Sequence, residues 1–155
     1  MKTVEFSDVE HQLTIGASVF PAVVENKPNF TSLADCIAWV KANKAELETQ
    51  LSDAGALLFR GFPINSAETF DEFSAAFGYD NFTYKESLSN AVRINFTERV
   101  FTANEAPKDA EIYLHHEMAQ TPIYPSKLFF FCQSAARCHF WNPYNSVMAI
   151  IRFYE

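Results

Sequence analysis

The most regular hydrophobic pattern in the chain is a long amphipathic stretch in its first third. Between Ile37 and Leu51, apolar side chains return every three or four residues, which is the spacing of one helix face. Ser32 is a suitable N-cap residue, and Gly55 can end the helix. This pattern predicts a helix over residues 33–52.

A buried strand and a second helix are predicted directly after it. Residues 56–59 form a short apolar run, and the glycine and proline of residues 60–63 close it, as expected for a buried strand that leaves into a turn. Ser66 then caps a helix whose phenylalanines share one face, and Gly78 supplies its stop. The phenylalanines of this face are Phe70, Phe73 and Phe77.

Short strands are predicted in the rest of the chain. Residues 11–24 are β-branched and apolar around a glycine and a proline, which indicates one or two strands with a bend. Residues 79–110 are mixed, with hints of strands at Val92, Ile94, Val100 and Phe101. Residues 112–118 are predicted to form a strand, and residues 127–133 a fully buried one.

Composition indicates one folded domain, which the predicted helices and strands place in the α+β class. With 155 residues, 48% of them apolar and 20% charged, the chain has a globular balance. Sixteen phenylalanines are a heavy aromatic load, and burying them usually needs two facing layers.

The charge excludes one class of partner and favours another. A formal net charge of −7 argues against nucleic-acid binding, which depends on clustered Lys and Arg. A small-molecule substrate fits better. No apolar stretch approaches the roughly 20 residues that cross a bilayer, so no membrane association is expected.

The cysteines and the first residues predict a cytoplasmic chain. Three cysteines without a Cys-x-x-Cys spacing indicate reduced thiols instead of a disulfide framework. The first twenty residues hold acidic side chains and lack the basic and apolar regions of a signal peptide.

His115 and Glu117 are the residues whose spacing indicates metal chemistry. In a strand, side chains two residues apart share a face, so this imidazole and this carboxylate can converge on one cation while His116 points away. Two histidines and one carboxylate form the facial triad of non-haem Fe(II) oxygenases and leave positions open for other ligands. The pair is therefore predicted to supply two iron ligands, with the third coming from elsewhere.

Two other interpretations of these residues remain open. The first is a histidine at a strand end that is simply hydrogen-bonded to a neighbouring carboxylate. The second is a zinc site made by His116 with Cys132, Cys138 and His139, although the five-residue gap between the cysteines is looser than structural zinc sites favour.

Four sequence blocks in fixed order resemble a known family. They are residues 55–62 (GALLFRGF), 99–105 (RVFTANE), 115–120 (HHEMAQ) and 125–130 (PSKLFF). Their order resembles the TauD/TfdA family of Fe(II)/2-oxoglutarate-dependent dioxygenases, in its clavaminate synthase-like branch, over roughly residues 15–136.

The resemblance carries expectations about fold and chemistry. It implies a double-stranded β-helix, or jelly-roll, that is incomplete here and has N-terminal helices packed on the sheet. It implies Fe(II) held by His115 and Glu117, 2-oxoglutarate as cosubstrate, and O₂-dependent hydroxylation of a small organic substrate. Asn104 and Glu105, just upstream, are plausible substrate contacts.

The resemblance stops near residue 137. The family's second histidine and its cosubstrate-binding arginine lie far downstream, and a chain ending at Glu155 has no room for them, so we expect an incomplete triad and no activity alone. Residues 1–136 are then the N-terminal part of a dioxygenase domain, and residues 137–155 an aberrant tail. The family continues here into a Gly-rich turn that ends in Thr-Pro. Read one base later, the codons of residues 141–144 allow Gly-Thr-Pro-Ile, so a frameshifted or mis-spliced reading is our hypothesis for the tail.

A non-catalytic role is the alternative function. A truncated product of this kind would leave sheet edges and apolar faces uncovered, which invites association with other chains. The chain would then be an interaction protein, and neither its substrate nor its oligomeric state follows from the sequence.

Overall fold

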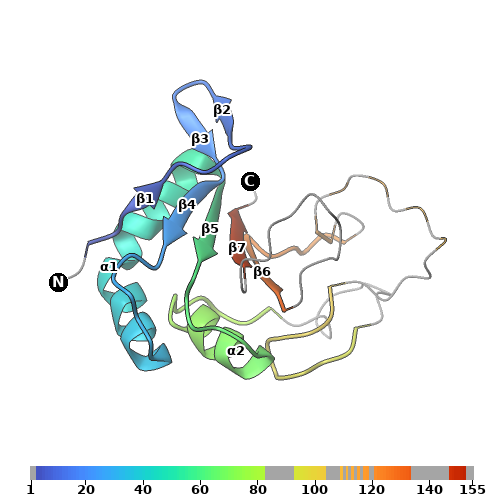
Figure 1. Cartoon of the computed structure of the whole chain (residues 1–155). Coiled ribbons are helices and arrows are strands. Elements are labelled where there is room, and N and C mark those ends of the chain that lie inside the picture. The colour runs from blue at the N-terminus through green and yellow to red at the C-terminus, as the bar shows by residue number, and fades with distance from the viewer. Residues whose placement is uncertain are drawn as a thin grey trace.

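A parallel pair of strands joined by a long helix forms the centre of the fold (Figure 1). The computed structural model describes residues 3–82, 93–103, 109, 111, 113, 115, 117–118, 121–133 and 147–152, the last segment through its backbone alone. The elements of these residues are β1 (Phe6–Ser7), β2 (Leu13–Ile15), β3 (Ser18–Phe20), β4 (Ala22–Glu25), α1 (Leu33–Ala54), β5 (Ala56–Arg60), α2 (Ala67–Ala75), β6 (Lys127–Cys132) and β7 (Val147–Arg152).

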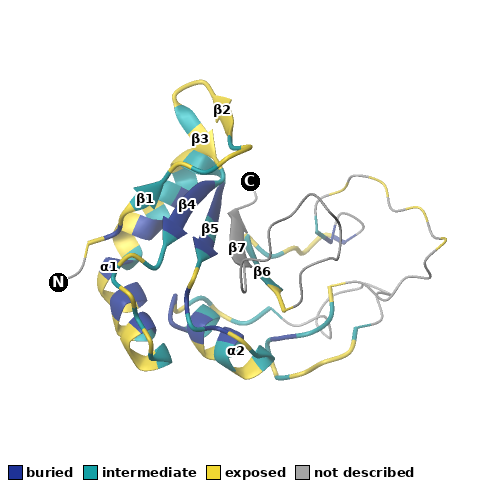
Figure 2. Cartoon of the chain, viewed as in Figure 1, coloured by how far each residue is buried: buried dark blue, intermediate teal, exposed yellow. Residues whose placement is uncertain are grey.

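The main sheet has the strand order β1-β4-β5-β7-β6. Strands β4 and β5 are parallel, with Val24 opposite Phe59, and the other neighbours in the sheet are antiparallel. Parallel neighbours need a long crossover connection, and α1 is that crossover. Because Val23, Val24 and Leu57 are fully buried, the β4–β5 pair lies in the core (Figure 2).

Helix α1 begins and ends where its local signals predict. The Ser32 hydroxyl accepts a hydrogen bond from the Asp35 amide at 3.1 Å, which satisfies one of the unpaired donors of the first turn. Gly55 ends the helix with a φ of 77°, and its amide donates to the Leu51 carbonyl at 2.9 Å. A side chain would strain this left-handed conformation, so glycine suits the position. The predicted helix is confirmed, with two more residues at its end.

Helix α2 is shorter than predicted but buries the expected face. Ser66 and Thr69 form a reciprocal capping box at its start. The helix ends at Ala75, so Phe77 lies beyond it, yet Phe77 is only 2% exposed. Gly78 follows in the left-handed region, with a φ of 69°.

Phe59 is the middle of an aromatic cluster between α2 and the sheet. Its ring makes edge-on contacts with Phe62, Phe73 and Phe77 at centroid distances of 5.7, 5.7 and 6.1 Å. Edge-to-face pairs at these distances are favourable beyond their buried area. Phe129 of β6 extends the cluster, 5.4 Å from Phe77.

The α+β prediction is confirmed, while several strands differ from their predictions. Residues 11–24 contribute to three strands, of which β2 and β3 form a separate hairpin with Leu13 and Ile15 exposed (Figure 2). The hints of strands in residues 79–110 amount to one bridge, between Asn95 and Phe101, in the described part of that segment, and Val92 lies outside the described residues. A complete jelly-roll is not formed by the residues that the structure describes.

The prediction that residues 127–133 are a fully buried strand is wrong in its burial. Strand β6 forms, but its residues are half-buried or exposed, and Phe130 is 42% exposed. The reason is its place in the sheet, because β6 is an edge strand with β7 as its neighbour. Apolar runs do not by themselves distinguish a central strand from an edge.

Strand β7 comes from the segment predicted to be an aberrant tail. It lies between β5 and β6 and pairs with both, Leu57 opposite Ile150 and Phe129 opposite Ile150. Residues 137–146 lie outside the described residues. The frameshift hypothesis for the tail stays a prediction, and the backbone of residues 147–152 is part of the sheet.

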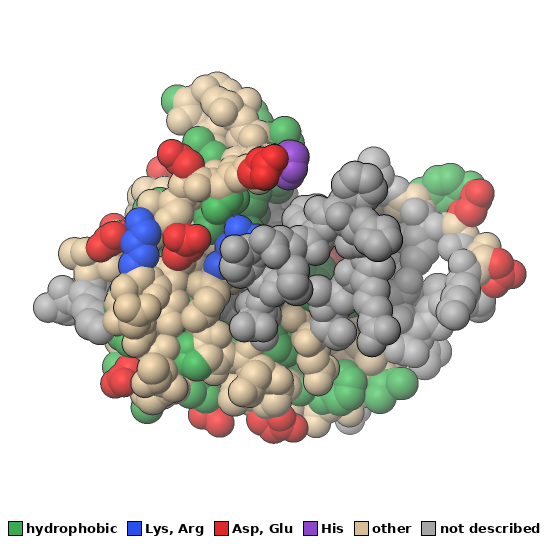
Figure 3. Space-filling model, in the orientation of Figure 1, with side chains coloured by type: hydrophobic (Ala, Val, Ile, Leu, Met, Phe, Trp, Pro, Cys, Tyr) green, Lys and Arg blue, Asp and Glu red, His purple; other side chains and the backbone are tan. Residues whose placement is uncertain are grey.

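Acidic side chains are scattered over the face shown in Figure 3, and the described residues there show no gathered basic patch. This agrees with the net charge of −7. Neither described helix is long and apolar enough to cross a bilayer.

Replacing Phe59 by Ala should lower the free energy of unfolding by about 3–5 kcal/mol, because it empties the middle of the aromatic cluster. Chemical denaturation followed by circular dichroism measures this. Phe130→Ala, at an exposed position of the edge strand, is the matched control and should cost much less. Equal losses in the two variants would contradict a core centred on Phe59.

Cys36 should be unreactive in the folded chain. Its side chain is fully buried, and burial, with a smaller contribution from the Asp35 carboxylate, raises the pKa of Cys36 to about 11. A thiol with such a pKa is only about one part in a thousand ionised at pH 8. In a Cys132→Ser, Cys138→Ser background, a disulfide reagent should label Cys36 only after denaturant is added.

The matched control keeps Cys132, which is exposed on β6, in a Cys36→Ser, Cys138→Ser background. Cys132 should react at once without denaturant. Fast labelling of Cys36 in the native chain would show that α1 opens readily.

Candidate functional site

His115 is exposed and is held through one ring nitrogen. Its Nδ1 lies 2.6 Å from the carbonyl oxygen of Tyr113. A carbonyl oxygen only accepts, so the hydrogen of a neutral His115 ring is on Nδ1 and the lone pair on Nε2. Metal-binding histidines are commonly oriented in this way, with the second nitrogen donating to a carbonyl or carboxylate. The ring is therefore in the tautomer that can bind a cation through Nε2.

Glu117 lies two residues further, at a reversal of the chain. Its side chain is half-buried, and Met118, which follows, is 2% exposed with a φ of 62°. A methionine in the left-handed region is strained, and such conformations persist only where the surroundings impose them. Here the chain turns back immediately after the carboxylate.

The predicted strand over residues 112–118 is not seen in its described residues, which are Tyr113, His115, Glu117 and Met118. The left-handed Met118 interrupts the extended backbone that a strand needs, and none of these described residues pairs with a neighbouring strand. The argument that placed both side chains on one face of a strand therefore does not apply. Their convergence stays a prediction, and His116 lies outside the described residues.

Thr121 stabilises the reversal after Glu117. Its amide donates to the Met118 carbonyl at 2.9 Å, and its buried hydroxyl lies 3.0 Å from that carbonyl and 2.6 Å from the carbonyl of Ile123. A hydroxyl has one hydrogen, so it donates to one carbonyl at a time or shares the hydrogen between them. The sequence pattern gave no indication of this role.

No third ligand joins the pair among the described residues. In that part of the chain, no group of three His, Cys, Asp or Glu side chains could hold a metal ion. Cys132 is exposed on β6, while Cys138 and His139 lie outside the described residues, as do Asn104 and Glu105. His115 and Glu117 are therefore two candidate ligands of an incomplete set.

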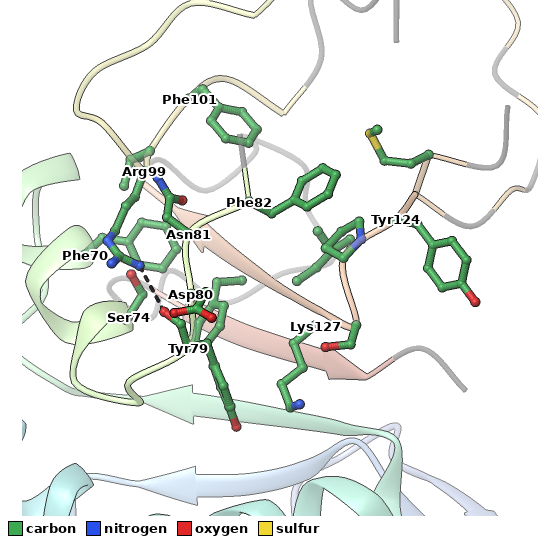
Figure 4. A pocket seen from close by; sticks show the side chains of 16 residues that line it. Phe70, Ser74, Tyr79, Asp80, Asn81, Phe82, Arg99, Phe101, Tyr124 and Lys127 are labelled. Carbon is green, nitrogen blue, oxygen red and sulfur yellow. Dashed lines mark hydrogen bonds between the residues drawn. The ribbon is translucent and has the colours of Figure 1, made fainter. Parts of the chain in front are cut away.

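Met118, which follows Glu117 in the sequence, is one of the residues that line a cavity of about 460 Å³. Figure 4 shows this cavity from close by. Ligand-binding pockets commonly have this size. Its walls come from α2, β6 and the loops that follow Phe77 and Glu98. The lining residues with polar or charged side chains are Ser74, Tyr79, Asp80, Asn81, Arg99, Tyr124, Ser126 and Lys127.

Tyr79 contacts several charged side chains at the polar end of the cavity. Its hydroxyl donates to Glu48 at 2.9 Å, and the ammonium groups of Lys44 and Lys127 lie over its ring at 5.1 and 4.5 Å from the centroid. Arg99 donates to the Tyr79 carbonyl at 3.4 Å (dashed in Figure 4). The tyrosine thus connects α1 to the cavity wall.

Arg99 and Lys127 belong to the sequence blocks that resemble the family, but the sequence alone did not assign either residue to a site. The sequence held one signal for Lys127, because a lysine at the start of an otherwise apolar strand is unusual and indicates a specific contact. No local signal could have brought Tyr79 to it, since the two residues are far apart in the sequence.

Comparison with known proteins agrees with the resemblance of the sequence blocks. Residues 25–139 match the profile of the family described as taurine catabolism dioxygenase TauD, TfdA family. A clavaminate synthase-like protein of Arabidopsis thaliana is 48% identical over 99 residues, which cover 64% of this chain and 29% of the relative. Dapdiamide synthesis protein DdaC of Enterobacter agglomerans is 35% identical over 86 residues, which cover 56% of this chain and 26% of that protein. The chain spans less than a third of the length of either relative.

Thr121→Val should lower the free energy of unfolding by about 1 kcal/mol, because the nearly isosteric side chain loses the hydroxyl that donates to Met118 or Ile123. Thr121→Ser keeps the hydroxyl and should stay close to the parent chain. Chemical denaturation measures both. If the serine variant lost as much as the valine variant, the hydroxyl would not be what stabilises the reversal.

Proposed function

The chain belongs to the TauD/TfdA family of dioxygenases, and from this premise we propose that it supplies two ligands of a non-haem Fe(II) site in a 2-oxoglutarate-dependent oxidoreductase that hydroxylates a small organic substrate. The observation that carries the proposal is the hydrogen bond from His115 to Tyr113. It leaves Nε2 as the metal-binding atom of a histidine two residues from a carboxylate. Both residues lie inside the matched range 25–139.

The residues present fit the metal that the family uses. An imidazole nitrogen and a carboxylate oxygen are the ligand types of the facial triad, and the tautomer of His115 is the correct one. When bound, Fe(II) together with 2-oxoglutarate supplies the activation of O₂ that hydroxylation requires. The chain's own part is to present Nε2 of His115 and the carboxylate of Glu117, and to hold the substrate in the cavity that Met118 helps to line.

The activity of the whole enzyme is itself a proposal, since the chain covers 29% and 26% of its two relatives. Two protein ligands bind a divalent cation weakly, so turnover requires the third. We expect metal binding by this chain to be measurable but weak, and turnover to be absent without a further ligand.

The second candidate function is that of a non-catalytic interaction protein. It is favoured by the lack of a three-ligand group among the described residues and by the exposed apolar side chains of the β2–β3 hairpin, Leu13 and Ile15. Exposed apolar residues of this kind are typical of contact surfaces when they are contiguous.

Metal binding tests the ligand assignment directly. Co(II) titration followed by absorption, or competition with a metal-sensitive dye, should show binding that His115→Ala or Glu117→Ala weakens at least about tenfold, because each variant removes one of two ligands. His11→Ala is the matched control, since His11 is also an exposed histidine beside a carboxylate, Glu10, at 3.5 Å. Equal affinity in all variants would show that the metal binds elsewhere.

Succinate formation and metal binding together separate the two functions. Given Fe(II), ascorbate and 2-oxoglutarate, the chain alone should release no succinate above the background without protein. Turnover that His115→Ala abolishes would instead show that this chain completes the triad itself. Absence of metal binding as well as turnover would favour the interaction protein.

A further inference from the structure

We propose that the cavity beside Met118 binds a small amino-acid-like zwitterion, with the ligand's carboxylate on Lys127 and its ammonium group on Asp80. The candidate metal pair does not require this binding site, since neither Lys127 nor Asp80 is a candidate iron ligand. The inference rests on the proposed function only for the fate of the ligand, which is then the substrate presented to His115 and Glu117.

Lys127 has N–H donors that no ion pair between described residues uses. It opens β6, is half-buried, and lines the cavity. Its ammonium group lies 4.5 Å from the centre of the Tyr79 ring, a cation–π contact that occupies one side of the group. An ammonium group has three N–H donors, and none of the ion pairs between described residues involves Lys127. A carboxylate is the natural partner for the donors that face away from the ring.

The other cationic side chains near Tyr79 already have carboxylate partners. Arg99 is paired with Asp71, its Nε 3.7 Å from the carboxylate, and also donates to the Tyr79 carbonyl. Lys44 lies on the same aromatic ring but is paired with Glu48 at 3.7 Å and does not line the cavity. Of the described cations near Tyr79, Lys127 is therefore the one suited to an incoming anion.

Asp80 gives the cavity its second charge. It lines the same cavity as Lys127, and the two do not form an ion pair with each other. Figure 4 shows both side chains, with Tyr79, at one end of the cavity and Phe82 and Phe101 at the other. Asp80 is exposed, so its carboxylate is accessible to a ligand. A ligand with one charge of each sign, such as an amino acid, can pair with both residues.

The remaining wall is apolar and suits the body of such a ligand. Its apolar residues include Phe70, Val100, Phe101, Leu128 and Phe129. Burying an aliphatic side chain against them is favourable, because it removes apolar surface of both partners from water. The carboxylate of Asp80 opposes a second negative charge, so the site favours a zwitterion over the dianion 2-oxoglutarate.

Four probes on the metal-free chain, in a buffer with a chelator, test this assignment. They are L-leucine, isocaproate (leucine without its ammonium group), isopentylamine (leucine without its carboxylate) and 2-oxoglutarate. Ligand-observed NMR titration should rank leucine tightest, isocaproate next, and the amine and 2-oxoglutarate weakest. Lys127→Gln should weaken leucine and isocaproate about tenfold, since it removes a charge-assisted hydrogen bond.

Two further variants sharpen the expected result. Asp80→Asn should bring leucine to the affinity of isocaproate and leave isocaproate unchanged or slightly tighter. Lys127→Arg keeps the charge and should retain much of the binding, which shows that the loss in Lys127→Gln is not a folding defect. Lys44→Gln is the matched control, because it removes the other cation on the Tyr79 ring and should leave all four affinities unchanged.

Several outcomes would overturn the inference. Leucine that fails to bind, or that binds Lys127→Gln as tightly as the parent chain, removes the carboxylate site. Lys127-dependent binding of 2-oxoglutarate that is tighter than that of leucine reassigns the cavity to the cosubstrate. His115→Ala separates this inference from the proposed function, since it should weaken metal binding at least about tenfold while leucine binding persists.

Discussion

The packing of aromatic rings around Phe59 is the constraint on which the rest of the structure depends. This side chain is 1% exposed. Its ring contacts Phe62 in the following turn, Phe73 of α2 and Phe77 just beyond α2. The cluster forms because β5 and the α2 segment present aromatic side chains to each other. Burial of apolar area is the dominant favourable term of folding, so these contacts decide how α2 sits on the sheet.

The same packing shapes the cavity. Phe70 of α2 stacks on Phe131 of β6 at a centroid distance of 5.3 Å, and Phe129 meets Phe77 at 5.4 Å. Phe70 and Phe129 also line the cavity, so the core and the binding surface share side chains. A change in the packing of these shared side chains would therefore also change the cavity wall, since interiors are close-packed.

Tyr79 connects this core to the charged residues. Its ring stacks on Phe77 on one side of the cluster, while its hydroxyl reaches Glu48 of α1 and its ring face receives Lys127. The position of Lys127 therefore depends on contacts from α1 and from the segment that follows α2. The candidate metal pair lies beside a different local feature, the left-handed Met118 and the hydrogen bonds of Thr121. Met118 also lines the cavity, so this feature and the aromatic core meet at the cavity wall.

Several features were predictable from the sequence because their causes are local. Helix α1 is specified by its apolar spacing and by the side chain of Ser32 and the flexibility of Gly55, all of which act within a turn or two. The residue types at 115 and 117, and the family to which they belong, could likewise be recognised without coordinates. The strand predicted over residues 112–118 is not seen in its described residues. The periodicity of a short segment does not reveal that the backbone adopts a left-handed turn at Met118.

What only the tertiary structure decided depends on contacts between distant parts of the chain. The pairing of β7 with β5 and β6 made β6 an edge strand and left Phe130 exposed, although its sequence resembles that of a buried strand. The contact of Lys127 with the Tyr79 ring also joins residues that are far apart in the sequence. Sequence alone determined which residues could bury, cap or bind a metal, whereas the partners of each were chosen by burial and hydrogen bonding across the fold, and these are not encoded in any local pattern.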